Sequence, residues 1–185
     1  MLKKTRRRPI LSLKKAMQKC SSSNTIEPLD TNSSTPKDNS SSPLQNRIIE
    51  IIDGLYVSDY SSLKDEHNLT VRKINTIINL TKKNCLNLYP TKYNYKTFNI
   101  SDKANEEIIE EMLLITNLIH ECLEREEVVL VHCFKGISRA PTMVIAYLIR
   151  YKGMGFEQAF DFVRKKSTGI DPNAGFLMQL CSLNN

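Results

Sequence analysis

The segment of this chain best equipped for chemistry is a run of eight residues: His132, Cys133, Phe134, Lys135, Gly136, Ile137, Ser138 and Arg139. A cysteine thiolate is a strong nucleophile, and the planar guanidinium of an arginine can donate to two oxygens of one phosphate group. Gly136 leaves the backbone free to curl around an anion, and the Ser138 hydroxyl is suited to donate to a departing thiolate. These residue types and spacings predict a loop that holds a tetrahedral oxyanion over Cys133.

The elements on either side must position this loop. An apolar, mostly β-branched run at 128–131 predicts a strand, and the apolar stretch at 142–149 predicts a helix. The loop then leads into a helix N-terminus, where backbone N–H groups favour anions. We expect this positive potential and Arg139 to lower the pKa of Cys133, and His132 to brace the loop rather than act as a base. The alternatives are a buried cysteine that acts as a small hydrophobic residue, and an ordinary helix start capped by Ser138.

The whole pattern predicts an α/β fold in a single domain, with a mostly parallel central sheet flanked by helices and the phosphate-binding loop between a central strand and a helix. Strands are predicted near residues 48–52, 55–58, 74–80, 94–100 and 128–132. Helices are predicted near residues 60–69, 105–123, 139–152, 156–166 and 173–182. In the second of these helices, four apolar residues fall on one face, which indicates packing against the core: Ile108, Met112, Ile115 and Ile119.

Three motifs resemble those of the dual-specificity branch of the cysteine-based protein tyrosine phosphatases, and they agree with that branch in their order and spacing along the chain. Residues 132–139 match the pattern His-Cys-x-x-Gly-x-Ser-Arg, and the sequence that follows continues it as in that branch. Residues 51–58 resemble its opening strand pair, and residues 171–180 resemble its closing Pro-Asn-x-Gly-Phe-x-x-Gln-Leu motif. The resemblance covers about residues 47–183. It implies that Asn173 helps to hold the loop near Arg139.

The family uses an aspartate on a separate loop as its general acid, and Asp102 occupies the matching position. The leaving oxygen of a phosphoester needs a proton, which a carboxylic acid at the mouth of the pocket can supply. The alternative is that Ser101 or Asp102 caps a helix that begins near Asn105, with Glu106 in its first turn.

The resemblance implies a protein phosphatase that hydrolyses phosphotyrosine and phosphoserine or phosphothreonine through a cysteinyl-phosphate intermediate. Its catalytic residues would be Cys133, Arg139, Asp102 and Ser138, and it would need neither metal nor cofactor. The scattered histidines at 67, 120 and 132 likewise do not have the spacing of a zinc site. Two alternatives stay open: a phosphatase for phosphoinositides or RNA 5′ phosphates, and a scaffold that binds phosphoproteins without hydrolysing them.

The net charge of +6 is concentrated at the N-terminus. Residues 1–20 contain eight Lys or Arg and no acidic residue, so the remainder carries 18 basic and 20 acidic residues. The near-neutral body argues against nucleic-acid binding. No apolar run reaches the roughly 18 to 20 residues needed to span a bilayer. Five irregularly spaced cysteines and the lack of a secretory signal predict a reducing compartment, the cytoplasm, the nucleus or both. The sequence leaves the oligomeric state open.

Residues 1–44 are predicted to be a disordered tail, basic and then rich in serine, before a catalytic domain at 45–185. The tail resembles segments that dock on mitogen-activated protein (MAP) kinases, with a basic cluster and two leucines: Arg6, Arg7, Arg8, Leu11 and Leu13. The alternatives are a nuclear-import signal at residues 3–8, a basic amphipathic helix for a membrane or an organelle, and a solvated run of charge.

Overall fold

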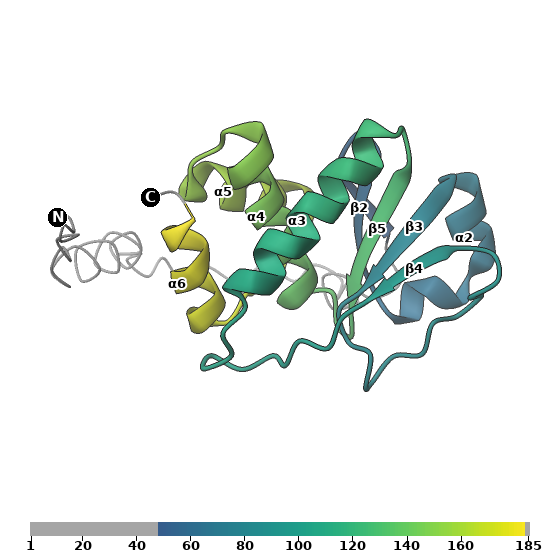
Figure 1. Ribbon diagram of the computed structural model, residues 1–185, viewed down its shortest axis with the longest axis horizontal. Helices are drawn as coiled ribbons and strands as arrows, with labels where there is room; N and C mark the ends of the chain where they lie inside the picture. The colour runs from purple at the N-terminus through teal and green to yellow at the C-terminus, as the bar shows by residue number, and fades with distance from the viewer. Residues whose placement is uncertain (1–47, 184–185) are drawn as a thin grey trace, which may run out of the picture. The chain divides into compact units, whose positions relative to one another are not determined.

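A five-stranded sheet lies at the centre of the computed structural model, which describes residues 48–183 (Figure 1). The strands are β1 (Ile48–Ile52), β2 (Leu55–Asp59), β3 (Ile74–Asn79), β4 (Asn94–Thr97) and β5 (Val128–Cys133). Their order is β1-β2-β5-β3-β4, and only the pair β1 and β2 is antiparallel. This confirms the predicted α/β fold with a mostly parallel sheet.

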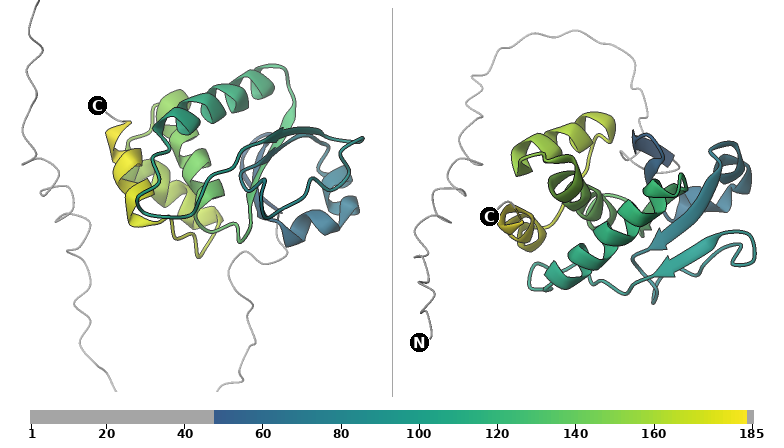
Figure 2. Two further views of the ribbon diagram at one scale, coloured as in Figure 1. Left: turned by 60° about the horizontal axis from the view of Figure 1, so that its bottom comes forward. Right: turned by 45° about the horizontal axis from the view of Figure 1, so that its top comes forward.

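Helices cover both faces of the sheet: η1 (Ser61–Lys64), α2 (Glu66–Val71), α3 (Ile109–Glu124), α4 (Arg139–Lys152), α5 (Phe156–Lys166) and α6 (Ala174–Ser182). In Figures 1 and 2, α3 to α6 gather on one side of the molecule and α2 lies on the other. Alternate residues of β5 accordingly enter two cores: Val129 and Val131 join the larger one and Leu130 the smaller. Burial on both faces explains why the first four residues of this strand, 128–131, are all apolar. Within residues 48–183, no helix is long and apolar enough to cross a membrane.

The predicted inward face of α3 is confirmed. Ile108, Met112, Ile115 and Ile119 are all at most 1% exposed and belong to the larger core. Against them packs α4, which is buried along nearly its whole length from Arg139 to Ile149. This burial on all sides agrees with the apolar stretch at 142–149 that predicted the helix.

Three predicted boundaries were wrong. The helix expected at 60–69 is two short elements, because Asp65 between them adopts an extended backbone conformation. The strand expected at 94–100 ends at Thr97, and pairing resumes only at an isolated bridge between Asn99 and Thr81. The helix expected from residue 105 begins at Ile109. Residues 98–108, which we call the acid loop, therefore connect β4 to α3 along the lower edge of the molecule in Figure 1.

Candidate active site

Cys133 is the last residue of β5 and lies at the carboxyl end of the central strand, beside Asp59 of β2. Its side chain is 1% exposed. The Gly136 backbone N–H donates to the Cys133 sulfur at 3.2 Å, so the chain curls back over the sulfur. Residues 133–139, the phosphate-binding loop, thus join β5 to α4 as predicted.

Gly136 makes this curl possible in two ways. Its φ is +72°, a left-handed backbone conformation that residues other than glycine adopt only at a cost in free energy. A Cβ at this position would also lie 2.9 Å from the Asp59 backbone nitrogen and 3.0 Å from the Ser58 carbonyl carbon. The loop therefore packs directly against the backbone at the end of β2, and only glycine fits there.

The expectation of a lowered pKa for Cys133 was wrong for this arrangement. Burial is the largest influence, and it raises the pKa of the Cys133 thiol above its ordinary value. The Ala140 N–H, the Arg139 guanidinium and the Gly136 N–H act in the opposite direction and favour the thiolate, whereas Asp102 adds to the rise. The sequence correctly indicated the positive groups, but it did not indicate that the sulfur is shielded from water.

His132 is completely buried within β5, and its ring stacks on Tyr60 with centroids 6.0 Å apart. Burial lowers the pKa of His132 to about 4, so the ring is neutral near pH 7. A neutral, immobilised imidazole fits the predicted bracing role better than it fits a general base.

Arg139 begins α4 and points toward the acid loop. Its Nη1 donates to the Ile100 carbonyl oxygen at 3.1 Å, and its Nε lies 3.5 Å from Asp102 Oδ2. The side chain is only 9% exposed, so the guanidinium is held in a fixed position. Ser138, the residue before α4, donates through its hydroxyl to Asp102 Oδ1 at 2.7 Å. The Ser138 proton is thus directed at Asp102 rather than at Cys133.

Asp102 is the point where three separate segments meet. Besides Ser138 and Arg139, Asn173 Nδ2 donates to Asp102 Oδ1 at 3.0 Å. The expectation that Asn173 holds the loop near Arg139 thus takes a specific form, a bond to the carboxylate beside that arginine. The alternative role of Asp102 as a helix cap was wrong, because α3 begins seven residues later and no side chain caps its first residue.

Two residues near the C-terminus fix the acid loop, and the sequence reasoning assigned them no role. Gln179 on α6 donates to the Glu106 carbonyl oxygen at 2.8 Å and accepts from the Ile108 N–H at 2.7 Å. At Gly175, an added Cβ would lie 1.8 Å from the Ala104 carbonyl oxygen. Both belong to the motif at 171–180, whose glycine and glutamine were the available signal.

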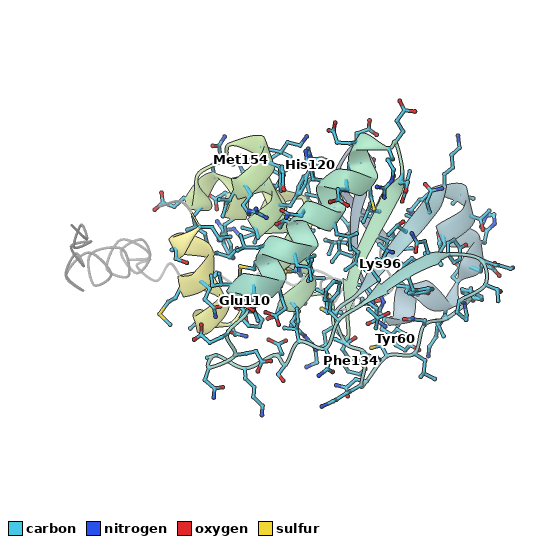
Figure 3. The ribbon with its side chains drawn as sticks, viewed as in Figure 1. Tyr60, Lys96, Glu110, His120, Phe134 and Met154 are labelled. Atoms are coloured by element: carbon cyan, nitrogen blue, oxygen red, sulfur yellow. The ribbon has the colours of Figure 1, made fainter. Side chains whose placement is uncertain are left out.

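The rest of the phosphate-binding loop is tied to its neighbours through the backbone. The Phe134 carbonyl accepts from the Tyr60 N–H at 3.2 Å, and the Ile137 carbonyl accepts from the Asp171 N–H at 2.7 Å. Figure 3 shows Phe134 and Tyr60 close together at the edge where β5 ends. The Phe134 side chain is 51% exposed and Lys135 is also exposed, so both are available at the rim of the site.

Comparison with known proteins agrees with this geometry. Residues 55–185 match the family described as "Dual specificity phosphatase, catalytic domain". The chain is 39% identical to a putative tyrosine phosphatase, 123R, of invertebrate iridescent virus 6 over 71% of this chain and 87% of that protein. It is 35% identical to MAP kinase phosphatase with leucine-rich repeats protein 3 of Dictyostelium discoideum, over 71% of this chain but only 15% of that much longer protein.

Among solved structures, the human tyrosine phosphatase-like serine/threonine/tyrosine-interacting protein is similar in fold, with a TM-score of 0.69 and 31% identity. The similarity covers 73% of this chain and 93% of that one. The family match, from residue 55 to residue 185, includes strands β2 to β5, the phosphate-binding loop and α6, and leaves out β1.

Proposed function

The chain belongs to the dual specificity phosphatase family, and from this premise we propose that it hydrolyses phosphotyrosine and phosphoserine or phosphothreonine in proteins through a cysteinyl-phosphate intermediate. The main support is the placement of Asp102. Its carboxylate lies 2.7 Å from the Ser138 hydroxyl and 3.5 Å from Arg139 Nε. Both of these residues belong to the loop that begins with Cys133. A nucleophile, an anion-binding loop and a proton donor therefore converge on one point.

In the first step, the Cys133 thiolate attacks phosphorus, and the bond to the leaving oxygen breaks as the sulfur–phosphorus bond forms. The loop N–H groups and Arg139 donate to the equatorial oxygens and stabilise the charge on them. An arginine has five N–H donors, and the described hydrogen bond to Ile100 uses one of the two on Nη1. Asp102 gives its proton to the leaving oxygen.

In the second step, water attacks the phosphorus of the cysteinyl-phosphate, and Asp102 accepts a proton from that water. Cys133 leaves as a thiolate, which the N–H groups of Gly136 and Ala140 favour. Ser138 assists this departure if its hydroxyl turns from Asp102 to the sulfur, which requires the Asp102 contact to open.

Kinetics on small esters test this proposal. Cys133→Ser is expected to abolish hydrolysis of an aryl phosphate. Asp102→Asn is expected to lower kcat on an alkyl phosphate by roughly 10²- to 10⁴-fold, and by much less on an aryl phosphate with a good leaving group. Asp161→Asn, on the exposed face of α5, is the matched control and should leave both rates unchanged. Equal losses on both esters in the Asp102 variant would argue against its role as the acid.

We further propose that the substrates include MAP kinases. The support is the similarity to a relative named as a MAP kinase phosphatase and the basic segment with Arg6, Arg7, Arg8, Leu11 and Leu13, which lies outside the described residues. Replacement of the three arginines by alanine is expected to reduce capture of a MAP kinase by the full chain, with unchanged hydrolysis of a small aryl phosphate. Unchanged capture would remove the docking role.

A further inference from the structure

A buried carboxylate that the proposed mechanism does not use lies beside the phosphate-binding loop. Asp59 is the last residue of β2, lies opposite Cys133 in the sheet and is only 2% exposed. A Cβ added at Gly136 would lie 2.9 Å from the Asp59 backbone nitrogen, so the loop packs against this residue. A carboxylate is costly to bury unless hydrogen bonds compensate for the lost water, so the contacts of Asp59 indicate its role.

The Asp59 side chain closes the turn that leads into η1. Its Oδ1 accepts hydrogen bonds from the Ser62 N–H at 2.7 Å, from the Ser62 hydroxyl at 2.7 Å and from the Ser61 hydroxyl at 3.0 Å. Ser62 is itself buried, and the next residue, Leu63, is completely buried in the smaller core. The turn is therefore anchored at both ends, by the sheet at Asp59 and by the core at Leu63.

Tyr60 lies within this turn and contacts the segment that carries Cys133 (Figure 3). Its N–H donates to the Phe134 carbonyl oxygen at 3.2 Å, and its ring stacks on the buried His132 with centroids 6.0 Å apart. The bonds from residues 61 and 62 to the Asp59 carboxylate fix the backbone on the far side of Tyr60. They therefore limit how far Tyr60 can turn away from the phosphate-binding loop.

The direction of the Phe134 carbonyl also sets the direction of the next N–H in the loop. This carbonyl and the Lys135 N–H belong to one planar trans peptide unit, in which the two groups point in opposite directions. A carbonyl held against Tyr60 thus turns the Lys135 N–H away from Tyr60. If this peptide unit rotated, it would present a carbonyl oxygen in place of an N–H, and a carbonyl oxygen repels a phosphate.

We propose that Asp59 is a positioning residue of the phosphate-binding loop. By closing the turn at residues 60–62, it holds Tyr60 against the Phe134 carbonyl, so that the Lys135 N–H stays directed at the bound phosphate. This deepens the proposed function and rests on it, since Asp59 acts through the loop and not on the substrate. A carboxylate suits this role because one ionised oxygen can accept from several donors at once.

Binding and turnover, measured on the full chain, test this role. Binding of a fluorescent phosphotyrosine peptide is followed by anisotropy with the Cys133→Ser change, and kcat/KM is measured with Cys133 intact. Asp59→Ala is expected to weaken peptide binding and to lower kcat/KM by roughly tenfold or more, as the loss of a charge-assisted hydrogen bond allows. Asp59→Asn should recover most of both, because its side-chain oxygen can still accept from the Ser62 N–H.

The choice of ester separates this role from that of the acid. Asp59→Ala should lower kcat/KM equally on aryl and alkyl phosphates, because it disturbs the loop that holds the phosphate and not the proton donor Asp102. A larger loss on the alkyl ester would assign the effect to the acid loop and overturn the proposal.

Asp65→Ala is the matched control. Asp65 also precedes a helix, α2, and its carboxylate accepts from the Asn68 side chain, but it is exposed. The control should lower the melting temperature without weakening peptide binding. Ser62→Ala removes one of the three donors to Asp59 and serves if Asp59→Ala does not fold. It should weaken peptide binding by roughly threefold, and unchanged binding there would also overturn the proposal.

Equal peptide binding by the Asp59→Ala and Asp65→Ala proteins would overturn the positioning role, whatever their melting temperatures. An Asp59→Asn protein as impaired as Asp59→Ala would do the same, since the acceptor oxygen would then make no difference. A failure of the proposed function would look different, because the unaltered protein would then not hydrolyse an aryl phosphate.

Discussion

Replacement of Gly175 by alanine tests whether the start of α6 positions the acid loop. A Cβ at residue 175 would lie 1.8 Å from the Ala104 carbonyl oxygen and 2.6 Å from its carbonyl carbon. Both are backbone atoms two residues from Asp102, so no side-chain rotation can relieve the overlap. The acid loop must therefore move away from α6, or the first turn of α6 must move.

The size of this movement follows from the contact. Going from 1.8 Å to the 3.4 Å of ordinary contact requires a shift of about 1.6 Å. The bonds from Ser138 and Asn173 to Asp102 are 2.7 Å and 3.0 Å long, so a shift of that size breaks at least one of them. A misplacement of about 1 Å can cost on the order of 100-fold in rate. We expect kcat on an alkyl phosphate to fall about 100-fold, within the range that a general acid contributes.

Helix propensity argues for the opposite outcome, which makes the test sharp. Gly175 is the second residue of α6, and alanine is about 1 kcal/mol more favourable than glycine within a helix. The assay is kcat on alkyl and aryl phosphates together with the melting temperature. Met178→Ala, at a 44% exposed position of the same helix, is the control. A Gly175→Ala protein with a raised melting temperature and an unchanged alkyl-phosphate kcat would refute the reasoning.

Three further changes test neighbouring contacts. Asn173→Ala removes both the α6 cap and the bond to Asp102, whereas Asn173→Ser keeps only a capping hydroxyl. Both should slow alkyl-phosphate hydrolysis, but only alanine should lose about 1 kcal/mol in chemical denaturation; equal stability would contradict this. Gly136→Ala, at a φ of +72° and 2.9 Å from the Asp59 nitrogen, should cost about 1–3 kcal/mol and weaken inhibition by inorganic phosphate. Unchanged inhibition would contradict the loop geometry. His132 is protonated in the unfolded chain below pH 6.5 but in the folded protein only below about pH 4. The free energy of unfolding should therefore decrease as the pH is lowered from about 6.5 to about 4, by on the order of 3 kcal/mol. In a plot of melting temperature against pH, His132→Phe should flatten this part of the curve. A variant curve that runs parallel to that of the unaltered protein would contradict the assignment.

The part of the site that the sequence predicts well is local. Cys133, Gly136, Ser138 and Arg139 lie within seven residues, and their geometry follows from a buried strand that runs into a buried helix. Apolar continuity predicts both elements, since each is covered on more than one side. A resemblance to known motifs then connects this loop to Asp102.

The parts that could not be predicted depend on contacts distant in sequence. The spacing of the apolar residues in α3 does not show where the helix begins. The Ile108 N–H, just before the helix, donates to the side chain of Gln179, which lies 71 residues away in the sequence. The Cys133 sulfur is shielded because the residue belongs to the larger core, which also contains residues of β2, α3 and α4. A sequence shows which charges are near such a group but not how much water reaches it, and burial is the larger influence on its pKa.

The start of the acid loop is held through its backbone, because the Phe98 N–H donates to the Asn79 carbonyl oxygen at 2.7 Å and the Ile100 N–H donates to the Leu80 carbonyl oxygen at 3.1 Å. The Asp102 carboxylate itself is held by side chains from other segments. Two of the side chains that hold Asp102 belong to residues that precede helices, Ser138 before α4 and Asn173 before α6. These helices pack together in the larger core, where Phe176 and Leu180 of α6 are completely buried. The hydrophobic packing of α6 therefore fixes where Asp102 lies, and a substitution beneath α6 should act on proton transfer before it acts on phosphate binding.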